Sequence, residues 1–260
     1  MKFYKGLCLF FCFTLFCNMN IVKAQKANQV QSGNFWLTAC KLDGNLGEWP
    51  IPLKAYNHMM KMSYSLANDD KFIYLAVSTN RAGKLAVGGL SFVLKRDDGT
   101  EGQIIFPYNP LHDRTKIEFF KRGVPSSIDG FELIEVSGIS SIKDSVISIY
   151  NEYEIQVGIK STTKDSKYYK KGEDFIEYEL AIPLDLLGLS LTGNKRLSYQ
   201  LKLRGQKVVG NPIKEIMVPE LMAKLRPDVS KAELMADYEK QVDVFSLTEL
   251  SGEYILCSKP

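Results

Sequence analysis

The sequence predicts an all-β fold: an antiparallel β-sandwich of about ten strands with a short helical insertion near the C-terminus. Three observations carry this prediction. Several segments alternate apolar and polar residues with the period of a half-buried strand, and polar turn residues separate these segments. Helix-forming composition is concentrated in residues 211–240, apart from a single helical turn expected at 184–187.

The clearest hairpin spans residues 61–77. In residues 61–67 every second residue is apolar, which predicts a half-buried outer strand. Residues 68–71 (NDDK) are polar and form the turn. Residues 72–77 are apolar on both faces, as in a central strand that is covered on both sides.

The other strands follow from the same reasoning. Ser230 is placed to cap a helix over 230–240 through Glu233, after a first helical stretch at 215–225. We expect one domain over residues 34–260, after a loose polar leader at 25–33. The remaining strands are expected at 35–40, 90–94, 103–106, 131–136, 146–150, 153–159, 176–182, 197–203, 242–247 and 254–257, with 146–150 and 153–159 as a hairpin.

The first residues have the pattern of a signal peptide. Lys2 and Lys5 precede a short apolar run at 6–16, and small side chains stand at the two positions that a signal peptidase reads in 22–24. Cleavage is expected before Gln25, so the mature protein is expected to be secreted or to reside in the periplasm or cell envelope. The apolar run is too short to span a bilayer, and no transmembrane segment is expected in the mature chain.

The net charge of the chain limits which classes of partner the sequence supports. The chain has 33 Lys and Arg against 30 Asp and Glu, and the signal peptide holds three Lys and no acidic residue, so the mature chain is formally neutral. Nothing in this balance favours a nucleic-acid partner.

Cys17 follows Phe16 rather than a small residue, so a lipoprotein anchor is not expected. Cys40 and Cys257 remain, either as a disulfide between the first and last strands or as two separate buried thiols.

Three segments resemble, in order and spacing, motifs of family 9 carbohydrate-binding modules. Residues 42–49 (LDGNLGEW) resemble the opening of that family, residues 68–77 its hairpin, and residues 178–187 (YELAIPLDLL) its later strand and turn. The resemblance covers residues 36–206 and extends to the superfamily of haem- and sugar-binding DOMON domains. It implies a β-sandwich that binds a glycan without catalysis. Sugar-binding members stack the sugar on exposed aromatic rings, often Trp, whereas this chain has Trp only at 36 and 49.

Two loops contain candidate ligand-binding residues. Tyr108, His112 and Arg114 combine an aromatic ring and a cation in a loop that follows a strand. Tyr168 and Tyr169 stand among lysines and offer a stacking platform at the rim of a sandwich. The alternative for both loops is an ordinary solvated loop.

Catalytic and cofactor motifs are not evident. Asp69 and Asp70 offer too few oxygens for calcium by themselves, and Met62, a residue type that ligates haem in some relatives, is expected to face the core. Glu177 and Glu179 are expected to point outward from a regular strand into solvent. We therefore expect no enzyme activity and no cofactor, and a glycan or another envelope component as the partner. The alternative is a structural or protein-interaction sandwich that has lost its sugar site and exposes an apolar patch along 216–225.

Overall fold

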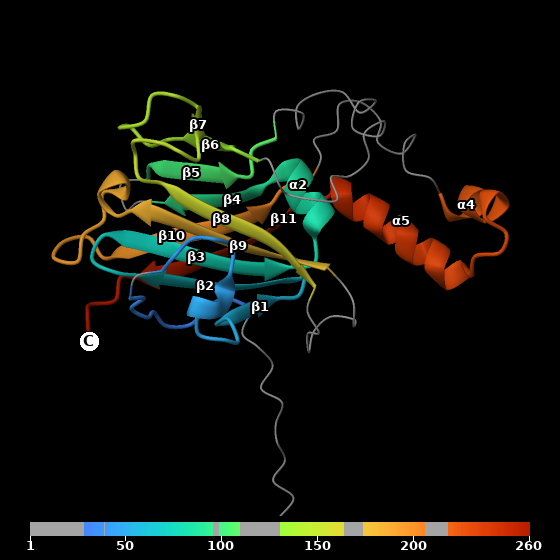
Figure 1. Cartoon of the computed structure of the whole chain (residues 1–260), viewed down its shortest axis with the longest axis horizontal. Coiled ribbons are helices and arrows are strands. Elements are labelled where there is room, and N and C mark those ends of the chain that lie inside the picture. Colours follow the sequence, from blue (N-terminus) through green and yellow to red (C-terminus); the bar gives the residue numbers. More distant parts are fainter. Residues whose placement is uncertain (1–28, 39, 96–98, 110–130, 164–173, 206–217) are drawn as a thin grey trace, which may run out of the picture.

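The computed structural model describes residues 29–260 except 39, 96–98, 110–130, 164–173 and 206–217. Within these residues two antiparallel sheets face each other across one core, which confirms the predicted sandwich (Figure 1). The expected signal peptide lies outside the described residues. No helix among the described residues is long and apolar enough to cross a membrane.

The two sheets contain eleven described strands. The five-stranded sheet has the order β1 (Ala55–Asn57), β2 (Met62–Asn68), β3 (Phe72–Thr79), β9 (Asp174–Pro183), β8 (Gln156–Thr163). The six-stranded sheet has the order β11 (Thr248–Ile255), β10 (Arg196–Leu203), β4 (Leu90–Lys95), β5 (Glu101–Phe106), β6 (Leu133–Ser137), β7 (Val146–Ser148).

Alternating side chains from both sheets fill the space between them. Tyr64 of β2 and Tyr199 of β10 are 0% and 1% exposed, and their hydroxyls lie 3.0 Å apart across the core. The Tyr64 hydroxyl also accepts a hydrogen bond from the Gln31 backbone N–H at 3.0 Å, so both buried hydroxyls have partners. The predicted β2–β3 hairpin is confirmed, with Leu66 opposite Leu75, and β3 is the central strand of its sheet.

The N-terminal segment, residues 35–53, covers the outer face of the five-stranded sheet and builds a second core there. Leu37, Leu46 and Trp49 pack with Tyr74 and with alanines of β2, β3 and β9. The expected strand at 35–40 is wrong, because the described residues of this segment form only a single bridge, from Trp36 to Asn68. Because of this cover, β2 is buried on both faces rather than half-buried.

Two further expectations are corrected. Gln31, expected in a loose leader, is 6% exposed, and its amide oxygen accepts from the Leu66 N–H at 2.6 Å. The strands β7 and β8 do not form the expected hairpin, because β7 belongs to the six-stranded sheet and β8 to the five-stranded one. A hairpin and a crossing between sheets have the same alternation of apolar residues, so the sequence pattern alone does not separate them.

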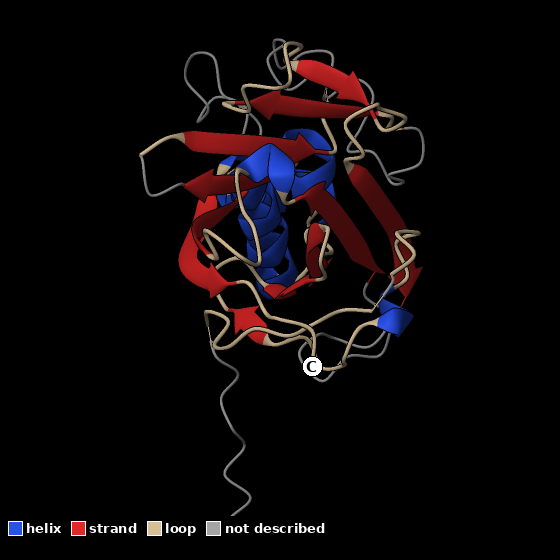
Figure 2. Cartoon of the chain, turned by 90° about the vertical axis from the view of Figure 1, so that its left-hand side faces the viewer, coloured by secondary structure: helices blue, strands red, loops and turns tan. Residues whose placement is uncertain are grey.

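The three α-helices that the structure describes lie at one end of the sandwich (Figure 1). The helix α2 (Ala82–Gly88) follows β3 and was not expected from the sequence, whereas α4 (Pro219–Leu225) and α5 (Lys231–Phe245) form the expected helical insertion. Ser230 and Glu233 make the predicted capping box at the start of α5. The helix runs to Phe245, so the strand expected at 242–247 is wrong. We call α4 and α5 the helical arm; it extends away from the sandwich in Figure 1, and Figure 2 shows α5 behind the strands when the opposite end faces the viewer.

Candidate functional site

The three family-like segments meet at one buried side chain, Glu179 of β9. Its Oε1 accepts a hydrogen bond from the Trp49 indole N–H at 2.8 Å, and its Oε2 accepts from the Gly44 backbone N–H at 2.9 Å. The Cys40 thiol lies 3.3 Å from Oε1. Glu179 is 0% exposed, so these donors replace the water that it loses on folding. The motifs therefore join the N-terminal segment to the sheet.

Two glycines allow this close approach. Gly44 has a φ of 77°, which suits glycine, and it turns the chain directly over β8. Gly158 of β8 pairs with Glu179, and a Cβ on Gly158 would lie 2.6 Å from the Gly44 nitrogen. A side chain at either position would push the turn away from the carboxylate.

Glu177 and Glu179 are buried, whereas the sequence predicted that both face solvent. Glu179 does point away from the sandwich core as the alternation predicts, yet the N-terminal segment covers it. Glu177 is also buried, at 4% exposure. Burial raises the pKa of Glu179 above its usual value, although the hydrogen bonds from Trp49, Cys40 and Gly44 act in the opposite direction.

Of the two alternatives for Cys40 and Cys257, a disulfide or separate thiols, the structure contains two free cysteines, both half-buried. The Cys40 thiol instead faces Glu179, and burial together with that carboxylate raises the pKa of the thiol. Cys257 lies after β11, where its backbone N–H donates to the Asn68 side chain at 2.7 Å. The alternative of two separate thiols is thus the one that the structure contains.

A pocket of about 460 Å³ opens at the end of the sandwich opposite α2 and α5, and we call it the end pocket. The turn between β2 and β3 and the loop after β9 form it, and both lie at the left of Figure 1. The β3–β9 pairing places Phe72 opposite Pro183, which brings these two turns together. The pocket is lined by Asp70, Lys71, Leu184, Asp185, Leu189, Ser190, Leu191 and Thr192.

Local hydrogen bonds fix both walls of the end pocket. On one side, Asp69 accepts from the backbone N–H groups of Lys71 and Phe72, which confirms its place in the hairpin turn. On the other side, the short helix η3 (Asp185–Leu187) ends at Gly188 in the left-handed conformation. The hydroxyls of Ser190 and Thr192 then lie 3.0 Å apart at the rim.

The end pocket combines exposed polar groups with buried leucines. Asp70, Lys71 and Asp185 are exposed, whereas Leu184 and Leu189 are 4% and 6% exposed. The Lys71 ammonium pairs with Glu154 at 2.6 Å, and this contact raises the pKa of Lys71. The pocket thus offers carboxylates, an ammonium and hydroxyls beside an apolar floor.

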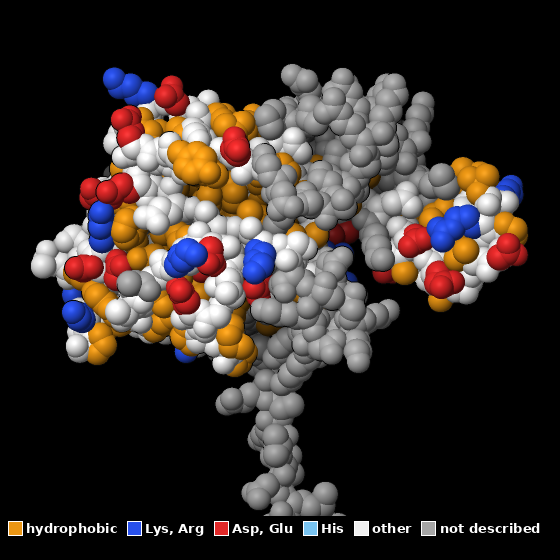
Figure 3. Space-filling view, viewed as in Figure 1, with side chains coloured by type: hydrophobic (Ala, Val, Ile, Leu, Met, Phe, Trp, Pro, Cys, Tyr) orange, Lys and Arg blue, Asp and Glu red, His pale blue; other side chains and the backbone are white. Residues whose placement is uncertain are grey.

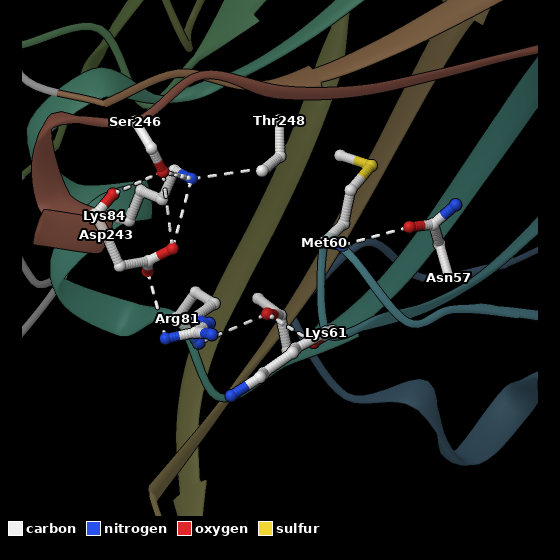
Figure 4. Close-up of polar contacts among 9 residues, drawn as sticks. Asn57, Met60, Lys61, Arg81, Lys84, Asp243, Ser246 and Thr248 are labelled. Carbon is white, nitrogen blue, oxygen red and sulfur yellow. Dashed lines mark hydrogen bonds and ion pairs between the residues drawn. The ribbon is translucent and has the colours of Figure 1, made fainter. Parts of the chain in front are cut away.

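The opposite end holds a polar network around a buried lysine, Lys84 of α2, which is 2% exposed (Figure 4). Its ammonium donates to Ser246 Oγ at 2.8 Å and to Thr248 Oγ1 at 3.2 Å, and it lies 3.5 Å from Asp243 Oδ1. Arg81 contacts the other oxygen of Asp243 at 3.0 Å. This network joins α2 to the C-terminal end of α5 and holds the helical arm on the sandwich.

Of the residues that the sequence suggested for ligand binding, the structure describes Tyr108 alone, and Tyr108 does not line the end pocket. Tyr108 follows β5, is half-buried, and donates its backbone N–H to the Leu133 carbonyl at 3.0 Å. His112, Arg114, Tyr168 and Tyr169 lie outside the described residues. The sequence analysis did not group the end-pocket residues, because their proximity depends on the pairing of β3 with β9, which the sequence alone does not give.

Comparisons with known proteins add one structural likeness. No family model matches the chain, and no curated protein matches it. A solved structure of a carbohydrate-binding module of family 9 from Caldicellulosiruptor kristjanssonii, in complex with glucose, is similar at 11% identity. The match covers 65% of this chain and 76% of that chain, with a TM-score of 0.27.

Proposed function

We propose that this protein is an exported module that binds a carbohydrate without transforming it, and that the end pocket holds the glycan. The observation that carries the proposal is the mixture of groups in that pocket. Carboxylates accept hydrogen bonds, an ammonium donates them, and the hydroxyls of Ser190 and Thr192 do both. Sugar hydroxyls need this combination, and the C–H groups of a pyranose ring need an apolar surface such as the leucine floor.

The pocket has the size and access for one or two sugar units. Its volume of about 460 Å³ falls within the range of small-molecule sites. Asp185 and Thr192 are exposed at its rim, so a chain of sugars is able to continue into solvent. This geometry fits recognition of a glycan end or a short stretch of polymer.

The same proposal makes the protein non-catalytic. Both oxygens of Glu179 are occupied by donors and the residue is 0% exposed, so a substrate does not reach it. In the described part of the chain, no group of three His, Cys, Asp or Glu side chains is placed to hold a metal ion. The proposal includes no cofactor, and the binding assay below includes calcium as a variable.

Export is part of the proposal and rests on the N-terminal sequence alone. A charged start, a short apolar run and small residues before Gln25 are typical of a cleaved signal peptide. The glycan would then belong to the cell envelope or to material outside the cell. N-terminal sequencing of the protein purified from its source tests the cleavage site, and a mature N-terminus other than Gln25 would contradict it.

A glycan-array screen with the chain from Gln25 to Pro260, with and without calcium, tests the binding function. We compare the unaltered chain with an end-pocket variant that combines Asp185→Ala and Thr192→Ala. A second variant combines Tyr168→Ala and Tyr169→Ala, and Tyr108→Ala is a third. Saturable binding that only the end-pocket variant loses is the expected result.

The other outcomes separate the alternatives. Binding that only the tyrosine variants lose would keep the function and place the site where the sequence first suggested it. Absence of binding to diverse glycans would contradict the carbohydrate proposal and favour the second candidate, a protein-interaction module.

One observation favours that second candidate. The helical arm buries Met222 and Leu234, but it leaves other apolar side chains at its surface (Figure 3). The exposed set consists of Leu221, Leu225, Met235 and Val242 in the two helices and Val218 directly before α4, with exposed fractions of 37–63%. A short helical pair with this much exposed apolar surface is the place where a protein partner would dock. A pull-down from envelope extracts with and without Leu221→Asp and Leu225→Asp tests it, and equal capture by both chains would contradict it.

A further inference from the structure

The charge balance of the end pocket indicates which glycans it selects. Lys71 contributes the only cation among the lining residues, and that cation is already paired with Glu154 at 2.6 Å. The carboxylates of Asp70 and Asp185 remain at the pocket, and among the described residues neither forms an ion pair with Lys or Arg within 4.0 Å. Together with Glu154, the pocket therefore has an excess of negative charge.

The hydrogen bonds that these carboxylates make within the chain leave acceptor capacity. Oδ1 of Asp185 accepts from the Leu186 N–H at 2.9 Å, which orients the carboxylate at the start of η3. An ionised carboxylate has about four acceptor positions on its two oxygens, so one backbone contact leaves most of them open. The other charged group, Lys71, is held beside the carboxylates by its contact with Glu154.

We propose that the end pocket selects glycans that carry a free amino group, such as oligomers of glucosamine, over their N-acetylated and acidic counterparts. This inference rests on the proposed function and names the ligand class of the same site. A protonated amine donates charge-assisted hydrogen bonds to Asp70 or Asp185, which are stronger than those from a neutral hydroxyl. The neighbouring sugar hydroxyls then use Ser190, Thr192 and the Lys71 ammonium.

The end pocket discriminates between glycans by repelling acidic sugars as well as by attracting amines. An acetylated amine loses its positive charge and offers the carboxylates only a neutral N–H donor, and a uronic acid places a further anion beside Asp70 and Asp185. Because the carboxylates are exposed, each contact is worth a few-fold in affinity at most, and we expect a preference of about three- to tenfold at low salt. The preference shrinks as salt screens the charges.

Calorimetric titration of the chain from Gln25 to Pro260 tests this inference. The probes are hexamers of glucosamine, N-acetylglucosamine, glucose and galacturonic acid, each titrated at low and at high salt. We expect the glucosamine hexamer to bind most tightly and the galacturonic acid hexamer most weakly. A lysine-rich peptide serves as an amine without a sugar, and it is expected to bind more weakly than the glucosamine hexamer.

Paired variants locate the effect. Asp70→Asn with Asp185→Asn removes two charges at the pocket, and Glu220→Gln with Glu239→Gln removes two exposed charges on the helical arm at the other end. The first pair is expected to abolish the preference for the amine while binding of the glucose hexamer persists, and the second pair to leave the preference unchanged.

The failures of the two proposals are distinguishable. Equal affinity for the glucosamine and glucose hexamers would overturn the preference for amines and leave carbohydrate binding in place. Equal binding of the lysine-rich peptide would overturn the assignment to a sugar. Binding of none of the hexamers would overturn both.

Discussion

Glu179 and Lys84 are both buried ionisable side chains, at 0% and 2% exposure, yet the protein holds them in different ways. Glu179 accepts from an indole N–H and a backbone N–H that have fixed directions. Lys84 donates to two hydroxyls, which rotate freely, and to Asp243, which also contacts Arg81. Removal of Glu179 therefore leaves fixed N–H donors without an acceptor. Removal of Lys84 leaves only rotating hydroxyls and Asp243, which still contacts Arg81.

Removal of the Glu179 carboxylate should have the largest effect. Glu179→Ala leaves the Trp49 and Gly44 N–H groups buried without an acceptor, at about 1–3 kcal/mol each, and opens a cavity beneath the N-terminal segment. We expect a loss of at least about 3 kcal/mol in the free energy of unfolding, measured by urea denaturation. Glu179→Gln keeps an amide oxygen for one of these donors and should lose less. Equal stability of Glu179→Ala and the unaltered chain would contradict the role of Glu179.

Gly158→Ala tests the same junction from the opposing strand. Its new Cβ would lie 2.6 Å from the Gly44 nitrogen and from the Leu42 carbonyl carbon, so the turn over Glu179 has to shift. Overpacking of this kind costs about 1–3 kcal/mol. Gly193→Ala is the control, because its Cβ meets no atom closer than 3.8 Å. Similar melting temperatures for the two variants would contradict this prediction, because they would show that the turn over Glu179 shifts at little cost in stability.

Lys84→Met should have a small effect on stability. Methionine fills a similar volume, no buried donor loses its acceptor, and Asp243 keeps its contact with Arg81. Replacement of a buried charge by an apolar residue of similar size is often neutral, so we expect a change below about 1 kcal/mol in urea denaturation. The matched variant Asp243→Ala leaves both cations without their carboxylate and should destabilise more. A loss of stability in Lys84→Met as large as that in Glu179→Ala would contradict the difference between the two buried groups.

The two groups should also respond to pH in opposite directions. Burial raises the pKa of Glu179 above 4.5, so its stabilising contribution is complete below 4.5 and is lost as pH rises through the raised pKa. Burial lowers the pKa of Lys84 below 10.5, so its contribution is complete above 10.5 and is lost as pH falls through the lowered pKa. The stability of the unaltered chain relative to Glu179→Gln should therefore fall with rising pH, and relative to Lys84→Met it should rise. Parallel trends in urea denaturation across pH would contradict this.

The sequence predicts local secondary structure better than it predicts which distant segments of the chain cover one another. Alternation and turn residues sufficed for the β2–β3 hairpin and for the sandwich as a class. The burial of Glu179 was not predictable in this way, because the Gly44 N–H that binds it is 135 residues away. The contact of Lys84 with Ser246 spans 162 residues and depends on where α5 packs.

The end pocket shows the same limit. The sequence marked the turn at 68–71 and a helical turn at 184–187 as separate features. Their union depends on the register of β3 with β9, which only the folded sheet defines. Tyr108, Tyr168 and Tyr169 were predicted as binding residues because the sequence identifies an aromatic side chain from a single position. A pocket is built from segments that are distant in the sequence, so it is not identified in this way.

The most direct test of the account is hydrogen–deuterium exchange on the chain from Gln25 to Pro260, with and without an excess of glucosamine hexamer. We expect slower exchange in the two segments that form the end pocket, residues 70–71 and 184–192, and no change in the helical arm. Slower exchange confined to the loops that contain Tyr108 or Tyr168, or no change anywhere in the chain, would contradict the end pocket as the binding site.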